Sequence, residues 1–302
     1  MNLLAFLLIV GSALFHATWN LLAKRGRLTV AYYAVMELTT TLCWSHVLLW
    51  SPVRLSKMPP RLYLFVLCST LCDGVVYVFG LSRSYRYMEM ATAYPLMRSL
   101  PILLTAFVTT VGGLGTALGP WTLVGFLLVF CGALLMPLMR FSDFNPKNYL
   151  SWSMGFVLLT ALGTTGYTIF DSFAVKEMSN ASPGVSKVMI SLTYASLRSA
   201  VQVGLLWAQT LSLQSERTRL AQIVSQRDWT APLAGVCCSL TYVLVLGAMT
   251  QVTNVSYVQA FRQLGLPFGM LAGVLVLKEK APLVKWVGVS LIVIGLAVSV
   301  LF

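Results

Sequence analysis

The stretch 91–109 combines a membrane-spanning, apolar length with side chains that are costly inside a bilayer. Tyr94, Arg98 and Pro101 lie in its middle, together with Pro95. An arginine at that depth must face other helices or a water-filled cavity, and each proline leaves a backbone carbonyl without its helical hydrogen bond. Tyr94 and Arg98 are four residues apart, so they lie on the same face of a helix. This spacing predicts that the stretch forms one wall of an internal polar site.

Polar side chains recur at helical spacing in several other apolar stretches, and we expect these faces to point toward the same site. The residues expected to bind substrate are His16, Asn20, Asp73, Tyr77, Tyr94, Arg98, Tyr167, Asp171, Tyr194, Arg198, Gln259, Arg262 and Gln263. The set includes arginines and acids, and Glu37 lies at similar depth. An unpaired charge there costs on the order of 3 kcal/mol. The alternative is therefore that these charges pair with one another and hold helices together.

Some of these charged residues favour one role over the other. Arg98 and Arg262 favour substrate contact, because both lie on proline-bearing segments where free carbonyl groups also line a cavity. Glu37 lies nearer the end of its segment and is expected to be structural, whereas Asp171 fits either role. His16 can titrate during transport, but a buried, hydrogen-bonded structural histidine is the favoured interpretation.

The arginines define the chemistry of the expected ligand. A guanidinium group matches a carboxylate, phosphonate or phosphate with two parallel hydrogen bonds. The tyrosines of the predicted site would add hydroxyl contacts and stacking surface. We therefore expect a small anionic or zwitterionic metabolite, and the arginines disfavour a cationic drug.

The composition determines the class of protein. The chain has 302 residues, of which 58% are hydrophobic and only 10% are charged, against about 25% charged in soluble proteins. A polytopic helical membrane protein embedded in a lipid bilayer is expected. The net charge of +12 comes from residues scattered through short loops, which does not indicate nucleic-acid binding. The six cysteines lie in apolar segments, so neither a disulfide framework nor a metal site is expected.

Windows of about 20 apolar residues predict ten transmembrane helices. Their approximate ranges are 2–23, 30–50, 62–82, 90–109, 120–139, 152–174, 185–208, 231–250, 254–277 and 282–302. A polar linker, 141–151, separates a first unit (1–140) from a second (152–302), each with five helices. The longest loop, 211–229, has the pattern of a short interfacial helix.

The two halves share a spacing of prolines and glycines. Pro101 precedes Gly125 and Gly132, and Pro267 precedes Gly288 and Gly295. Glycines seven residues apart permit close packing of another helix. Because each half has an odd number of spans, the two copies would insert in opposite orientations, as inverted repeats do in many secondary transporters.

The chain resembles the EamA-type ten-helix members of the drug/metabolite transporter superfamily. The similarity is clearest over Ser256–Leu301, where small residues, Pro267, an apolar run, the pair Lys278–Glu279 and a glycine-spaced last segment follow one another. The segments ATAYPLMRSLPILL and GPWTLVGFLLVFCGALL of the first half are similar, as is LFHATWNLLAKR near the start. The resemblance implies two inverted five-helix repeats and alternating access at a midplane site.

The resemblance also implies export across the cytoplasmic membrane of a bacterium, by proton coupling or exchange, with both termini in the cytoplasm. Loops after odd-numbered segments carry more Lys and Arg, which by the positive-inside rule would place both termini outside. The orientation therefore stays open, as do the substrate's identity and the formation of a homodimer.

Two other classes of protein are weighed against a transporter. An intramembrane enzyme needs a nucleophile with a base, or a metal cluster, and the chain has only two histidines and no HExxH or G-x-S-x-G motif. A channel needs a filter motif or a charged ring, and neither is visible. No P-loop is present, so we expect no nucleotide, cofactor or catalytic residues.

Overall fold

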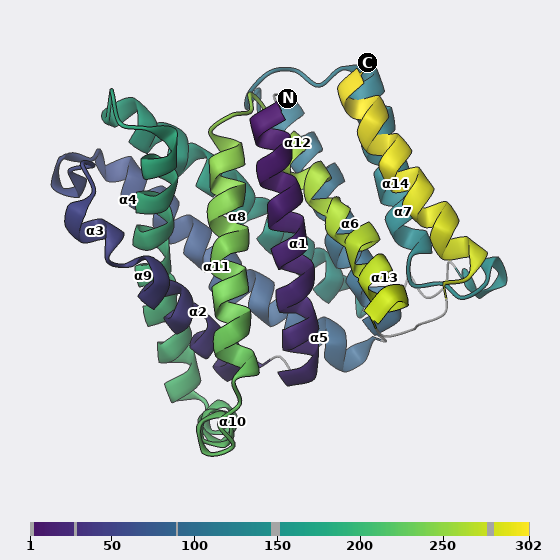
Figure 1. Cartoon of the computed structure of the whole chain (residues 1–302), viewed down its shortest axis with the longest axis horizontal. Coiled ribbons are helices and arrows are strands. Elements are labelled where there is room, and N and C mark those ends of the chain that lie inside the picture. Colours follow the sequence, from purple (N-terminus) through teal and green to yellow (C-terminus); the bar gives the residue numbers. More distant parts are fainter. Residues whose placement is uncertain (1–2, 27–28, 89, 146–151, 277–280, 302) are drawn as a thin grey trace.

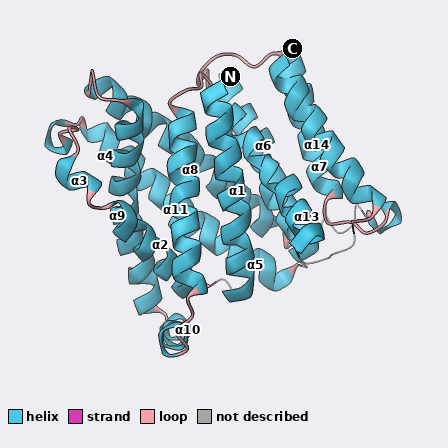
Figure 2. Cartoon of the chain, viewed as in Figure 1, coloured by secondary structure: helices cyan, strands magenta, loops and turns pink. Residues whose placement is uncertain are grey.

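The computed structural model describes residues 3–26, 29–88, 90–145, 152–276 and 281–301, and its regular elements within these ranges are helices (Figure 2). They are α1 (Leu3–Gly26), α2 (Val30–Trp44), α3 (Val47–Trp50), α4 (Pro60–Leu71), α5 (Val78–Tyr87), α6 (Met90–Val111), α7 (Pro120–Leu135), α8 (Met154–Ala181), α9 (Lys187–Ser212), α10 (Gln214–Ser225), α11 (Thr230–Met249), α12 (Val255–Phe261), α13 (Gly265–Val276) and α14 (Leu283–Leu301). Short irregular turns are η1 (Leu55–Lys57), η2 (Cys72–Tyr77), η3 (Phe141–Asp143) and η5 (Arg262–Leu264). The prediction of an all-helical chain is confirmed.

Four stretches within the described residues are long and apolar enough to cross a membrane. They are Leu3–Ala23, Pro60–Leu81, Thr230–Met249 and Leu283–Leu301. Two shorter apolar helices, Leu96–Val111 and Pro120–Leu135, accompany them. Their outward faces carry large apolar side chains such as Leu7, Val111 and Leu127, more than half exposed in the isolated chain. By length and composition this is a multi-pass membrane protein.

Local sequence signals explain where several helices begin. Thr29 caps α2 by accepting a hydrogen bond from the backbone N–H of Tyr32, and Ser186 caps α9 in the same way. Pro120 stands at the first turn of α7, where its missing N–H costs nothing. Asn254 caps α12 by accepting from Ser256.

Two of the helical segments that carry polar residues are irregular where those residues lie. Between α4 and α5 the chain forms the π-helical turn η2, which contains Asp73. The helix that begins at α12 tightens at Arg262 into the 3₁₀ turn η5. Pro267, shortly after η5, lacks the N–H that would bond the carbonyl of Gln263 in a regular α-helix. The sequence windows predicted continuous helices at both places.

The helices pack in pairs, among them α7 with α14, α1 with α11 and α2 with α9 (Figure 1). At one edge of the bundle α7 and α14 lie side by side, with glycines against each other. A Cβ atom on Gly125 would stand 2.4 Å from the carbonyl oxygen of Gly295, and one on Gly132 would stand 2.6 Å from that of Gly288. Only glycine permits this approach. The expectation that these glycines let another helix pack closely is confirmed.

The helix expected in 211–229 is present as α10, which lies at the lower end of the bundle in Figure 1. The carboxylate of Glu216 accepts a hydrogen bond from the backbone N–H of Ala31 at 2.9 Å, at the start of α2. Arg219 donates to the carbonyl of Gly26 at 2.7 Å, at the end of α1. These contacts match an acid to a helix N-terminus and a base to a C-terminus, so α10 contacts the end of α1 and the start of α2.

Some predicted features lie outside the described residues. These are the pair Lys278–Glu279, residues 146–151 of the predicted linker, and the side chains of Asn20 and Tyr94.

Candidate functional site

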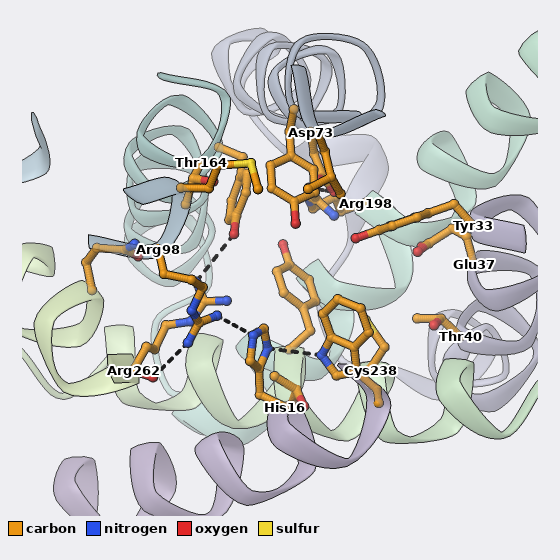
Figure 3. Close-up of a pocket in the computed structure, with 18 of the residues that line it drawn as sticks. His16, Tyr33, Glu37, Thr40, Asp73, Arg98, Thr164, Arg198, Cys238 and Arg262 are labelled. Carbon is orange, nitrogen blue, oxygen red and sulfur yellow. Dashed lines mark hydrogen bonds and ion pairs between the residues drawn. The ribbon is translucent and has the colours of Figure 1, made fainter. Parts of the chain in front are cut away.

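A cavity of about 130 Å³ lies inside the bundle, where helices from both halves of the chain meet (Figure 3). Nine of the residues predicted to bind substrate line it: His16, Asp73, Tyr77, Arg98, Tyr167, Arg198, Gln259, Arg262 and Gln263. Their side chains come from α1, η2, α6, α8, α9, α12 and η5. The structure thus brings most of the predicted site together around one space.

One side of the cavity is cationic. Arg98 donates through Nη2 to the backbone carbonyl of Arg262 at 3.1 Å, and Gln263 donates to the carbonyl of Arg98 at 2.9 Å. Arg262 donates to the hydroxyl of Tyr167 at 3.5 Å. Among the described residues, no carboxylate lies within ion-pair distance of either arginine. The Nε atom of Arg98 is buried and has no hydrogen-bond partner among the described residues. Both guanidinium groups therefore retain capacity for an acceptor.

His16 also lies on this side. The indole N–H of Trp19 donates to Nδ1 of His16 at 3.0 Å, and Nη1 of Arg98 contacts Nε2 of the same ring. A neutral imidazole has only one accepting nitrogen, so the N–H groups of Trp19 and Arg98 compete for it. His16 therefore contacts both Trp19 and Arg98 on the cationic side of the cavity.

The third arginine, Arg198, is tied into carboxylates. It reaches Asp73 through Nη2 at 2.9 Å and Asp171 through Nε at 3.4 Å, and Nε donates to the hydroxyl of Ser69 at 2.9 Å. Its guanidinium carbon stands 4.9 Å from the ring centroid of Tyr242, within the range of a cation–π contact. Arg198 is 5% exposed, so this charge is both buried and compensated.

Asp171 is the buried anchor of that network. It is 0% exposed and accepts hydrogen bonds from the hydroxyls of Tyr194 at 2.7 Å and Tyr242 at 2.8 Å. Ser69 also donates to it. Buried carboxylates in proteins require such partners. Asp171 and the fully buried Tyr194 do not line the cavity. The prediction that both contact substrate therefore lacks support in this geometry. Asp171 instead contacts Arg198, and Tyr194 donates to Asp171.

Glu37 lies on the same side of the cavity as Asp73 and Arg198, across from Arg98 and Arg262 (Figure 3). Its Oε1 accepts a hydrogen bond from the hydroxyl of Ser199 at 2.6 Å. Within the described part of the chain, no cationic side chain lies within ion-pair distance of it. The sequence led us to expect a purely structural role, whereas the structure places this carboxyl group on the cavity wall.

Further lining residues were not among those predicted to bind substrate. They are Trp19, Tyr33, Thr40, Leu81, Met97, Thr164, Cys238, Thr241 and Tyr242. The spacing of Tyr33, Glu37 and Thr40 along one face of α2 is a sequence signal for them. On α11, Cys238, Thr241 and Tyr242 have the same kind of spacing, but the segment looks uniformly apolar.

Aromatic side chains also line the cavity, and Tyr167 contacts arginines of both sides. The rings of Tyr77 and Tyr167 meet edge to face, with centroids 6.4 Å apart and an interplanar angle of 87°. Trp19, Tyr33 and Tyr242 complete this lining. No group of three His, Cys, Asp or Glu side chains in the described ranges is placed to hold a metal ion.

Comparisons with known proteins identify the fold only. No protein-family model matches the chain, and no curated protein matches it. A solved structure described as "Crystal structure of protein" is similar, with a TM-score of 0.66 and 16% sequence identity over 98% of this chain and 96% of that chain. At that identity the similarity shows a shared architecture along nearly the whole length.

Proposed function

We propose that this protein is a secondary transporter that moves a small anionic or zwitterionic metabolite by alternating access. The observation that carries the proposal is the cationic side of the cavity, where Arg98 and Arg262 line the space without a carboxylate partner among the described residues. Uncompensated charge inside a membrane protein is costly and marks substrate pathways. A carboxylate, phosphonate or phosphate group supplies the missing charge and the acceptor atoms.

The donors of Arg98 support the same ligand chemistry. Its Nε is buried without a hydrogen-bond partner among the described residues. A cationic ligand would place positive charge against Arg98 and Arg262. An oxyanion accepts from these groups, and this favours an acidic substrate over the export of a cationic drug.

The helix pairing supports two inverted five-helix repeats, 1–140 and 152–302, as in the EamA-type drug/metabolite transporters that the sequence resembles. The fifth helix of one unit (α7) packs on the fifth of the other (α14), and the second (α2) on the second (α9). The first helix of the first unit, α1, packs on α11, the third of the second unit. The reciprocal pair, α8 against α4, η2 and α5, is also present. Reciprocal pairs of this kind are expected of a pseudo-twofold axis.

The resemblance further supports export across the cytoplasmic membrane of a bacterium, driven by a proton or by exchange. In this proposal the two units rock about the cavity.

Reconstitution into liposomes tests the proposal. A panel of small carboxylates, phosphonates and phosphates is screened for thermal stabilisation of the purified protein, and each hit is used for uptake and counterflow. We expect saturable flux with counterflow, which Arg98→Gln abolishes. Arg98→Lys keeps the charge but loses the bidentate fork, so it should retain weak flux. Arg61→Gln is the matched control, because Arg61 is exposed and pairs with Glu177.

Three outcomes would contradict the proposal. Flux that does not saturate would indicate a channel, and a chemically altered substrate would indicate an enzyme. Normal transport of the acidic substrate by Arg98→Gln would remove the oxyanion argument.

A further inference from the structure

The cavity keeps Arg98 and Arg262 apart from the carboxylate of Glu37. Arg98 and Arg262 lie on one side, while Glu37 lies on the opposite side together with the paired Asp73 and Arg198 (Figure 3). In a low-dielectric interior, opposite charges gain most by direct contact. Here α2 holds Glu37 away from the arginines of α6 and η5. A single charge on the ligand can compensate only one of the two sides.

We infer that the ligand is a zwitterion with its charges at opposite ends, and that Glu37 binds the cationic end. This inference rests on the proposed function, in which Arg98 and Arg262 hold the anionic end. It assigns Glu37 a role in choosing between zwitterions and simple anions. The ligand class is then an ω-amino acid or a molecule with the same separation between an ammonium and an oxyanion.

The other carboxylates on that side, those of Asp73 and Asp171, already have partners within the protein. Asp171 is fully buried and accepts from Ser69, Tyr194 and Tyr242. Asp73 lies 2.9 Å from Arg198. Both share Arg198 as a cationic partner, whereas Glu37 has no such partner among the described residues.

Glu37 differs from both. Ser199 donates to its Oε1, and none of the described residues donates to its Oε2. The charged and titratable groups near it are Asp73 from η2, Arg198 from α9, Cys238 from α11 and Tyr33 from its own helix. Arg198 is the only cation among these, and it is bound to Asp73 and Asp171. An ammonium group on the ligand would meet a carboxylate with a free oxygen.

The middle of the cavity fits the uncharged part of such a ligand. Tyr167 reaches both charged sides, since its hydroxyl accepts from Arg262 at 3.5 Å and its ring centroid stands 5.8 Å from the guanidinium carbon of Arg198. The rings of Tyr77 and Tyr167 offer apolar surface to a carbon chain. On the acidic side, Tyr33 also lines the cavity. The site therefore suits a ligand that is charged at both ends and has an apolar middle part.

The test compares three forms of each ligand. Glycine, 4-aminobutyrate, 5-aminovalerate and 6-aminohexanoate vary the separation of the charges. Their N-acetyl derivatives keep only the anion, and their amides keep only the cation. Affinities are measured on purified protein in lipid nanodiscs for the wild type, Glu37→Gln and Arg98→Gln. Glu177→Gln is the matched control, because Glu177 pairs with Arg61 outside the cavity.

We expect the wild type to bind at least one zwitterion about 30-fold more tightly than its N-acetyl derivative, as the loss of a desolvated charge contact predicts. Glu37→Gln should lose that preference while binding the N-acetyl anion as well as the wild type does. Arg98→Gln should weaken binding of both forms. The control should behave as the wild type.

The contrary outcomes separate this inference from the proposed function. A wild type that binds the N-acetyl anion as tightly as the zwitterion, or a Glu37→Gln that keeps the preference, overturns the zwitterion and leaves the oxyanion site standing. Binding of the amides with no loss in Arg98→Gln overturns both. A wild type that binds none of the zwitterions overturns the inference as well.

Discussion

Arginines on the two sides of the cavity have contrasting surroundings. Arg198 contacts Asp73 and Asp171 and is packed against the ring of Tyr242. Arg98 contacts His16 and a backbone carbonyl, and Arg262 contacts a tyrosine hydroxyl. An arginine is thus an internal ion-pair partner on one side of the cavity, whereas on the other side the arginines have no carboxylate partner among the described residues.

The difference shows that intramembrane charge alone does not identify a ligand contact. Removing one member of a buried ion pair leaves the other uncompensated, so the paired arginine stabilises the fold. In the proposed transporter, an arginine without a carboxylate partner is expected to contribute little to stability and to gain its counter-ion from the ligand. Measuring stability and transport separately for each side therefore tests this contrast.

The largest effect on stability is expected for Arg198→Met. The substitution leaves the carboxylate of Asp171 buried without a cation, at a cost of about 3–5 kcal/mol. Folded yield and thermal unfolding in detergent measure this. The double variant with Asp171→Asn should recover part of the loss, because the remaining charge is removed with it. A stable Arg198→Met protein would break the comparison.

A smaller loss of about 1.5–3 kcal/mol is expected for Tyr194→Phe, which removes a hydrogen bond to a charged and fully buried group. Chemical denaturation monitored by tryptophan fluorescence gives the difference in free energy. The Tyr63→Phe protein is a suitable control, because the exposed hydroxyl of Tyr63 bonds only to the carbonyl of Leu55. Equal losses in the two variants would mean that the buried network adds nothing.

For Asp73→Asn we expect the free energy of unfolding to fall by about 1 kcal/mol, which is less than for Tyr194→Phe. The side chain of Asp73 is 18% exposed to the cavity, and Arg198 retains Asp171 as a counter-ion. Thermal unfolding measures the shift. A loss as large as that of Arg198→Met would mean that Asp73, not Asp171, is the main partner of this arginine.

The smallest effect on stability, within about 1 kcal/mol, is expected for Arg98→Met, because no carboxylate is left uncompensated. The same protein should show no counterflow of the acidic substrate. Thermal unfolding and flux are measured on one preparation. A strongly destabilised protein would place Arg98 in the same class as Arg198.

Much of this arrangement could be predicted from the sequence. The apolar windows predicted the helical segments, and the combination of Arg98 with nearby prolines indicated a cavity wall. The amphipathic pattern of 211–229 predicted α10. Local periodicity carries this information, because it depends on residues within a few turns of one another.

The partners of the charges could not be predicted in the same way. Arg198 and Asp73 are far apart in the sequence and meet only because η2 turns Asp73 toward α9. Glu37 lies in a recognisable polar stripe, yet its place on the cavity wall depends on how α2 packs against its neighbours. Tyr242 lies in a segment that looks apolar throughout. Such relations depend on tertiary distances, which helical spacing does not contain.

Mapping the reactivity of each arginine tests the contrast most directly. The protein in lipid nanodiscs is treated with methylglyoxal, a small reagent for guanidinium groups, and modified sites are identified by mass spectrometry with and without the acidic substrate. We predict that Arg98 and Arg262 react and that substrate protects them, while Arg198 reacts only after unfolding. Reaction of Arg198 as fast as Arg98, or substrate that protects neither Arg98 nor Arg262, would contradict the account.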